Sequence, residues 1–269
     1  MARTTVRPAL MTVRPPVGVT SGHVTDPLAP LLELAGVDDA VQSARQAVDA
    51  VHRHPTNRKG WPTTAAEASV RAARASAAID GGDAEIPPDG EVREPVLAGA
   101  LRVAEALGGM LSTWQRSPLQ VLARLHVLAA ADLIENPDRL GRPRQDEAVA
   151  RRLELLAELV TGGTSVPGPV QAAVVHGELL ALRAFGPGDG VIARAAARLT
   201  MIATGLDPKG LAVPEVAFFR RLGTYQEAAE AFASGTSDGV RQWLLFHCEA
   251  IETGAKEAVG IADAAGEAR

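Results

Sequence analysis

The sequence predicts an all-α protein on two observations. Alanine makes up 50 of the 269 residues, and alanine and leucine are among the strongest helix formers. From residue 26 onward, apolar residues recur at the i, i+3, i+4 spacing of amphipathic helices. The β-branched and aromatic residues do not form the alternating runs that indicate strands, so a β-rich fold is not expected.

Composition narrows the classes of function. The formal net charge is −5, which gives no overall electrostatic basis for nucleic-acid binding. The one cysteine, Cys248, excludes an internal disulfide and a cysteine-based zinc site. Charged residues interrupt every apolar stretch before the roughly 18 to 20 residues of a membrane span, and prolines interrupt any N-terminal signal sequence. We therefore expect a cytoplasmic protein with no nucleic-acid or membrane partner.

The chain divides into four parts by pattern. Residues 1–25 hold Pro, Thr and Val without a stable period, which predicts a flexible arm. Residues 26–62 form an N-terminal helical segment that ends in a polar turn over 52–62. Residues 63–260 form the main helical domain. The small and charged tail, residues 261–269, is expected to fray.

The main domain is predicted to consist of consecutive helices. Thr63, Thr64 and Glu67 resemble a capping box, which predicts a helix from there to Ile79. Asp80 and two glycines then end it. A loop with room for a short hairpin follows at 82–92. The further predicted helices are at about 93–115, 117–133, 144–161, 167–184, 190–204, 214–233 and 237–265.

The most unusual segment is the Gly/Pro loop between two of these helices, with the sequence RAFGPGDGVIAR over 183–194. Gly188 and Gly190 allow backbone conformations that other residues rarely adopt. Successive N–H groups there can point into one concavity, next to the positive end of the following helix. Arg183 and Arg194 flank it. An anion cradle would fit this pattern, and a plain helix–loop–helix corner explains the loop alone more simply.

This string resembles the motif of the Fic (Fido) family of adenylyltransferases, His-Pro-Phe-x-Asp/Glu-Gly-Asn-Gly-Arg-x-x-Arg. Phe185, Gly188, Gly190 and Arg194 match it. Four further segments occur in the order of the family. They are Ser76 to Gly81, similar to the inhibitory motif Ser-x-x-x-Glu-Gly; Leu125-His126 with the loop 141–144; 175–180; and 205–208 with Tyr225 and 243–246.

The resemblance covers roughly 63–260 and implies a Fic-like helical bundle with an N-terminal helical extension. It implies that 63–81 is an inhibitory-type helix, in which Ser76, Asp80 and Gly81 are the motif residues and Asp80 replaces the Glu. Gly188, Asp189, Gly190 and Arg194 are then the nucleotide- or phosphate-binding residues. Arg194 matches the motif Arg that contacts either the γ-phosphate or the inhibitory Glu.

The departures from the motif remove its chemistry. Arg183 takes the place of the His that acts as general base, and Arg stays protonated. Pro187 replaces the acid that binds Mg²⁺ and offers no ligand. Asp189 puts a negative charge where phosphate would lie, and Val191 replaces the first motif Arg. No catalytic residue and no metal site are therefore predicted, and Mg²⁺ is not expected.

Asp80 has two interpretations. It either forms an ion pair with Arg194 or only ends its helix, and a separation above about 6 Å would exclude the pair. His126 and His176 each lie mid-helix on an apolar face and are interpreted as core histidines, Cys248 as a small buried residue. Trp114, Trp243 and Phe246 are candidate core residues.

Three hypotheses for function remain open. The first is a degenerate Fic-like protein that no longer transfers AMP and acts as a nucleotide- or phosphate-binding or regulatory module. The second is an active Fic-type transferase with a diverged motif, and the third is a structural interaction protein without a ligand. ATP is the ligand that the resemblance implies. A protein partner or target and a homodimer are compatible with the sequence.

Overall fold

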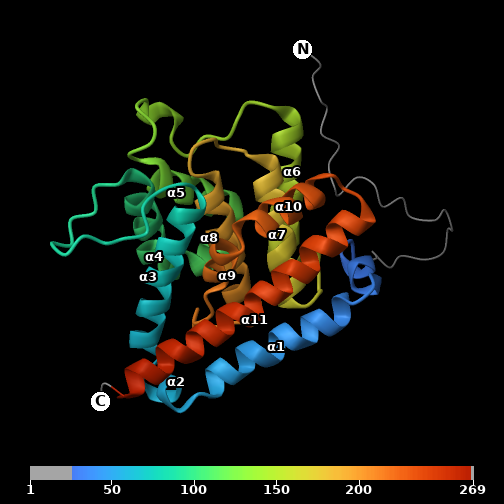
Figure 1. The fold of residues 1–269 in the computed structure, drawn as a ribbon. Coiled ribbons are helices and arrows are strands. Elements are labelled where there is room, and N and C mark those ends of the chain that lie inside the picture. The colour runs from blue at the N-terminus through green and yellow to red at the C-terminus, as the bar shows by residue number, and fades with distance from the viewer. Residues whose placement is uncertain (1–25, 268–269) are drawn as a thin grey trace.

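The computed structural model describes residues 26–267, which contain helices and no strand (Figure 1). The predicted arm 1–25 lies outside the described residues. The helices are Val37–Arg53 (α1), Pro55–Lys59 (α2), Trp61–Ile79 (α3), Pro95–Trp114 (α4), Pro118–Ala130 (α5), Glu147–Glu158 (α6), Gly168–Leu182 (α7), Asp189–Ala203 (α8), Pro214–Arg220 (α9), Leu222–Ala233 (α10) and Ser237–Glu267 (α11). The predicted all-α class is confirmed.

Helix α7 lies at the centre of the molecule. Twelve of its fifteen residues are buried, and a helix that is apolar on all sides is a core helix. The indole Nε1 of Trp243 in α11 donates to the Ala173 carbonyl at 2.7 Å. Gly177 faces the Trp243 and Phe232 rings so closely that a Cβ would lie 2.8 Å from the latter. Glu178 forms a buried ion pair with Arg152 of α6.

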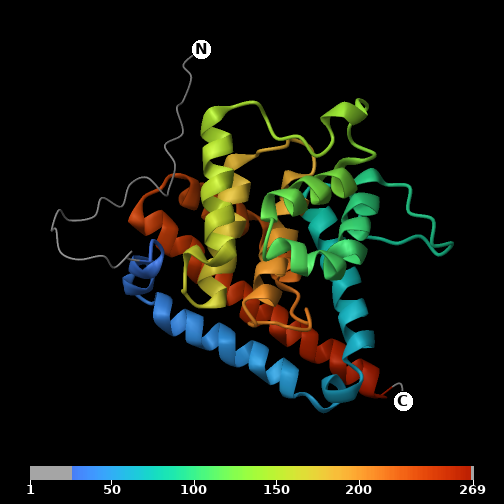
Figure 2. The same ribbon diagram turned by 180° about the vertical axis from the view of Figure 1, so that it is seen from behind.

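Two hydrophobic clusters pack on either side of α7. One joins α7 to α10, α11 and the N-terminal α1. The other joins α7 to α4, α5, α6 and α8. Figures 1 and 2 show α1 running along the long α11 at the edge of the molecule, in the same direction. The N-terminal helical segment is thus an extension that packs on the C-terminal helix.

Several predicted boundaries were wrong for local reasons. Helix α3 begins at Trp61 rather than at a capping box, because the Thr64 hydroxyl donates to the Asn57 side chain at 2.7 Å instead of capping. The predicted polar turn contains the short helix α2. The predicted helix 214–233 is divided at Arg221 into α9 and α10. The segment 82–92 forms a loop without a hairpin.

The predicted frayed tail is also wrong as far as Glu267, where α11 ends. Ile261 and Ala262 are buried, and Ile261 packs against Ala68 and Ala72 of α3. Small residues on one face of a helix allow a close approach, which is why a tail that looks weakly apolar still docks. Residues 268–269 lie outside the described residues.

Helix α4 has the length and average composition of a membrane-spanning helix, the one such case among residues 26–267. It contains Arg102 and Glu105, and Leu97, Val103 and Trp114 on its inner face are buried. It packs against α3, α5 and α8. In this structure α4 therefore packs one face against the hydrophobic core.

The contact between α4 and α5 depends on Gly99, where an added Cβ would overlap the Ala129 carbonyl. We expect Gly99→Ala to lower the free energy of unfolding by about 1 kcal/mol or more, because overpacking forces the helices apart. Gly108 is on the same helix with nothing near its Cβ position, so Gly108→Ala should raise stability by up to about 1 kcal/mol. Urea unfolding of the two variants checks the contrast, and equal effects would contradict it.

Candidate functional site

The loop between α7 and α8 begins with a left-handed residue. Arg183 has φ 45° and is the one non-glycine residue with positive φ in the described part of the chain. A non-glycine residue in this region costs roughly 1–2 kcal/mol. Gly186 and Gly188 follow with φ of 103° and 87°, so the predicted need for glycine is confirmed at Gly188. Gly190 is different: it is helical, and a Cβ there would collide with the Asp80 carboxylate.

The side chain of Asp189 folds back and binds backbone N–H groups of the loop that precedes it. Its Oδ1 accepts from the Phe185 N–H at 3.1 Å and its Oδ2 from the Gly186 N–H at 2.8 Å. Burial raises the pKa of this carboxyl, while these two bonds act in the opposite direction. Two N–H groups of the loop are thus taken by a carboxylate of the chain itself. They belong to Phe185 and Gly186, whereas the anion cradle was expected around Gly188 and Gly190.

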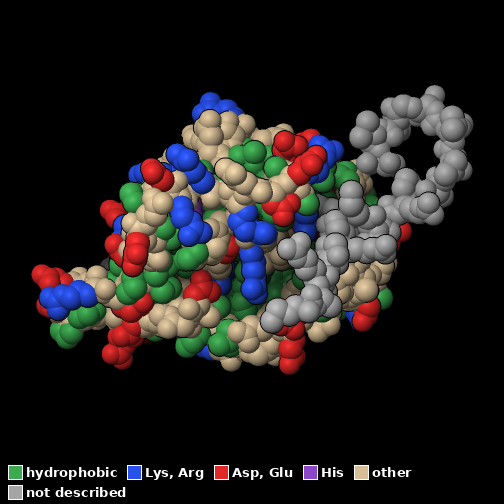
Figure 3. All heavy atoms as spheres, turned by 90° about the horizontal axis from the view of Figure 1, so that it is seen from above, with side chains coloured by type: hydrophobic (Ala, Val, Ile, Leu, Met, Phe, Trp, Pro, Cys, Tyr) green, Lys and Arg blue, Asp and Glu red, His purple; other side chains and the backbone are tan. Residues whose placement is uncertain are grey.

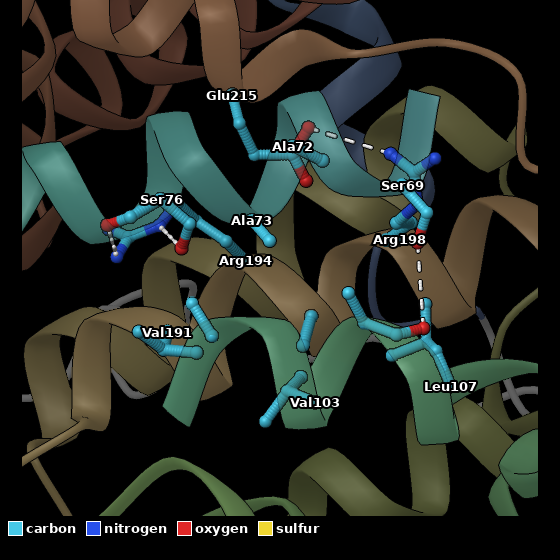
Figure 4. Close-up of a pocket in the computed structure, with 13 residues that line it drawn as sticks. Ser69, Ala72, Ala73, Ser76, Val103, Leu107, Val191, Arg194, Arg198 and Glu215 are labelled. Carbon is cyan, nitrogen blue, oxygen red and sulfur yellow. Dashed lines mark hydrogen bonds and ion pairs between the residues drawn. The ribbon is translucent and has the colours of Figure 1, made fainter. Parts of the chain in front are cut away.

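Arg194 lies in the second turn of α8 with only 2% of its surface exposed. Its Nε donates to the Ser76 hydroxyl at 2.7 Å and its Nη2 to the Ser76 carbonyl at 3.0 Å. Nη2 also lies 2.8 Å from Oδ2 of Asp80. The ion pair considered from the sequence is therefore present. Figure 4 shows the Arg194 side chain against Ser76 at the end of α3.

The far side of the guanidinium faces Tyr225 of α10. Nη1 of Arg194 lies 3.4 Å from the Tyr225 hydroxyl, which in turn lies 3.0 Å from Nε2 of His176. His247 of α11 extends this row of polar contacts, with its Nε2 3.2 Å from Nδ1 of His176. The interpretation of His176 as a core histidine is confirmed. The sequence did not indicate that Tyr225 lies beside Arg194 or that His247 lies behind His176.

Burial governs the charges of this buried group. It lowers the pKa of His176 well below its ordinary range and that of His247 to about 3, so both rings are neutral near pH 7. The pKa of Arg194 is raised even though burial itself lowers it, because the Asp80 carboxylate stabilises the charged guanidinium. Arg194 is thus the cation of the group and Asp80 its counter-charge.

The segments upstream of the loop hold it in place. Arg144 caps the C-terminal end of α7, since its Nη2 donates to the Leu182 carbonyl at 2.8 Å and its Nε to the Arg183 carbonyl at 3.0 Å. The N–H of Gly141 donates to Nδ1 of His126 at 2.8 Å. The His126 ring lies 5.0 Å from that of Phe185. His126 therefore joins the two loops rather than being only a core residue.

The residues that replace the motif His and acid are on the surface. The side chains of Arg183 and Pro187 are exposed. Figure 3 shows the face formed by the loops at the top of Figure 1, where arginine side chains gather among scattered acidic ones. The exposed arginines of these two loops are Arg139, Arg142, Arg144 and Arg183.

The donor set does not fit the Mg²⁺ that the resemblance associates with the motif. Among residues 26–267, no three His, Cys, Asp or Glu side chains come together in a way that could hold a metal ion. Pro187 offers no ligand, and both oxygens of Asp189 accept backbone N–H groups. The described residues of this loop therefore do not supply a set of ligands for Mg²⁺.

A small cavity opens beside Arg194, between α3, α4 and α8 (Figure 4). Its volume is about 30 Å³, against roughly 300–1,000 Å³ for ligand pockets. Mostly small side chains line it, with Arg198 and Glu215 at the α9 end. Burial raises the pKa of Glu215, and its carboxylate lies 3.6 Å from Arg198. The cavity is large enough for a water-sized molecule and too small for a nucleotide.

A larger hollow of about 470 Å³ lies where α5 begins and α6 ends. Its lining includes Ser117, Leu119, Glu158 and Thr161. The motif loop contacts the other end of α5, since Gly188 lies against Ala129. The hollow is thus remote from Arg194.

Comparison with known proteins points to one fold. No family model and no curated protein matches the sequence. A solved Fic family protein from Desulfovibrio desulfuricans G20 aligns with a TM-score of 0.65 at 20% identity, over 84% of this chain and 74% of that chain. Fic-1 from C. elegans aligns with a TM-score of 0.65 at 17% identity, over 88% of this chain and 75% of that chain.

A variant of the C. elegans protein gives a TM-score of 0.67 at 17% identity, over 86% of this chain and 74% of that chain. Identities this low establish the fold and leave the chemistry of the loop to its own residues. Several of the segments that the sequence picked out meet at 183–194: they are 76–81, 125–126, 141–144 and Tyr225. The segment 205–208 lies elsewhere, since Asp207 binds His52 of α1. The chain has the Fic fold.

Proposed function

We propose that this Fic-fold chain does not transfer AMP and instead acts as a phosphate- or nucleotide-binding regulatory module that Asp80 holds closed. The ion pair between Asp80 and Arg194 carries the proposal. Arg194 is the one charged motif residue retained, and a guanidinium that is only 2% exposed is costly unless it is paired with an anion. Here that anion is Asp80.

An external anion would have to take the place of Asp80. Only 2% of the Arg194 side chain is exposed, compared with 25% of that of Asp80. Ser76 and Tyr225 cover the other nitrogens of the guanidinium. The Asp80 carboxylate also lies against Gly190 in the first turn of α8. A phosphate group and the Asp80 carboxylate therefore compete for one place.

The described loop has no group ready to act as a general base. Arg183 stays protonated, and both oxygens of Asp189 accept N–H groups. Nδ1 of His126 accepts from the Gly141 N–H, so the proton of the neutral ring is on Nε2. Losing a general base costs about 10²- to 10⁴-fold in rate, which supports a binding role over a transferase.

Calorimetric titration with ATP or pyrophosphate, without Mg²⁺, tests the binding half of the proposal. We expect Asp80→Ala to bind at least about tenfold more tightly than the wild type, because the competing carboxylate is gone. Asp83→Ala is the matched control: it removes an exposed acid of the same loop that accepts from the Glu85 N–H rather than from Arg194. Unchanged affinity in Asp80→Ala would overturn the proposed anion site.

Incubation with labelled ATP and Mg²⁺, alone and with lysate protein, tests the other half. We expect no transfer of label by the wild type or by Asp80→Ala. Transfer by either protein that is lost on changing Arg194 would establish the alternative, an active transferase with a diverged motif.

A further inference from the structure

A buried row of polar side chains connects Arg194 to the far end of the core. Tyr225, His176 and His247 are 4%, 0% and 1% exposed. They come from α10, α7 and α11, three different helices. Buried polar side chains cost stability unless they are hydrogen-bonded, and this row ends on the one motif cation.

The donor inventory assigns a direction to the row. A guanidinium has only donors, so the Tyr225 hydroxyl accepts from Arg194. Its single proton is then directed to Nε2 of His176. The neutral His176 ring carries its proton on Nδ1 and donates to Nε2 of His247. Nδ1 of His247 has no hydrogen-bond partner in the structure, so the row ends there.

We propose that Tyr225, backed by His176 and His247, is a positioning residue that holds the Arg194 guanidinium in place for an anion when Asp80 withdraws. This inference rests on the proposed anion site. The other contacts of Arg194, to Ser76 and Asp80, all belong to α3 and its end. Tyr225 is the contact that remains if the end of α3 moves away.

The hydroxyl is itself well fixed. The Tyr225 ring stacks on Phe218 with centroids 4.9 Å apart and also packs against the rings of Trp243 and Phe246. A donor or acceptor locked by packing keeps its partner within the geometry that binding requires. The position of Arg194 is thus set by a rigid core and not only by the segment that blocks it.

Tyr225 is also the only tyrosine in the chain, so tyrosinate absorbance reports on this site alone. The charged and titratable groups around it are Arg194 of α8, Asp80 after α3, Glu215 of α9 and His176 of α7, with His247 of α11 behind His176. Burial raises the pKa of Tyr225, Arg194 lowers it, and Asp80 and Glu215 raise it.

The first experiment is a spectroscopic titration of the intact protein, with far-ultraviolet ellipticity recorded in parallel to mark unfolding. We expect Asp80→Asn to lower the pH at which tyrosinate forms, because Arg194 loses its counter-charge. Pyrophosphate should raise that pH again in the variant and not in the wild type. An identical midpoint in wild type and variant, with the helices intact, would mean that Tyr225 does not sense Arg194.

The second experiment measures pyrophosphate affinity and decides the case if the helices unfold before tyrosinate forms. We expect Tyr225→Phe to weaken binding about three- to tenfold in the Asp80→Ala background, the worth of one ordinary hydrogen bond, because 3.4 Å is long for a bond to a charged group. Phe232→Leu in the same background is the matched control. It truncates another buried ring of α10, one that packs on Trp243, and should cost stability while leaving affinity unchanged.

The outcomes of the two proposals are separable. If Asp80→Ala binds no pyrophosphate, the proposed function fails, while the tyrosinate titration still tests the contact with Arg194. If Asp80→Ala binds and Tyr225→Phe has no greater effect than Phe232→Leu, the anion site stands and the positioning role is overturned.

Discussion

Acid should destabilise this protein well before its carboxylates are all protonated, because two histidines are buried in neutral form. An unfolded histidine has a pKa near 6.5, whereas burial lowers that of His247 in the folded chain to about 3. Between these values the unfolded chain binds a proton that the folded chain does not. The free energy of unfolding is therefore unaffected by protonation of His247 above pH 6.5, and it falls as the pH is lowered from 6.5 towards 3.

The expected size of the effect is large for one residue. Each pH unit costs about 1.4 kcal/mol per histidine in this window, so His247 alone should account for about 2 kcal/mol at pH 5. His176 acts in the same direction, because burial and the nearby Arg194 and His247 all lower its pKa. Glu178 and Glu215, whose pKa values burial raises, oppose part of this trend above their ordinary pKa.

A difference measurement isolates the histidine. His247→Phe removes the group that cannot be protonated in the fold, together with the unpartnered Nδ1, and leaves Nδ1 of His176 without its partner. Urea unfolding at several pH values should show that the variant loses less stability than the wild type between pH 6.5 and 5, by about 2 kcal/mol. Parallel stability curves for the two proteins would show that His247 is protonated or exposed in the fold.

The sequence could predict the parts of this site that depend on local pattern, which are the ends of helices and the loop between them. Asp80 follows the end of one helix and Arg194 follows the start of another. Both lie in segments that resemble Fic motifs. Their contact was therefore a prediction with a distance limit. Asp189 could have been placed more fully, since an Asp three and four residues after free N–H groups commonly bonds back to them.

Tyr225 and His247 were beyond the reach of that pattern. Helical periodicity shows which side of a helix is buried, but not which other helix that side faces. The orientation of α10 depends on the break at Arg221 between α9 and α10, which no proline marks and after which Gly223 lies already inside the next helix. The docked end of α11 was missed for a related reason, since Ala and Gly residues fit both a frayed tail and a close helix contact.

The effect of Gly190→Ala on stability should depend on which residue occupies position 80. In the wild type the added Cβ meets the Asp80 carboxylate. The carboxylate would then have to move away from Arg194. Because Arg194 is only 2% exposed, its charge would be left buried without a partner, which is costly. We expect a loss of about 2 kcal/mol of unfolding free energy. In the Asp80→Ala background the obstacle is absent, and alanine should add up to about 1 kcal/mol through helix propensity.

The double-mutant cycle measures this coupling directly, at about 2 to 3 kcal/mol between the two positions. Urea unfolding of the four proteins gives the stability terms, and pyrophosphate titration shows whether Gly190→Ala frees the anion site without removing the Asp80 charge. Gly223→Ala in α10, with nothing near its Cβ position, controls for helix propensity alone. Additive effects of Gly190→Ala and Asp80→Ala would show that the carboxylate does not rest on the first turn of α8, and the closed state would then lack its physical basis.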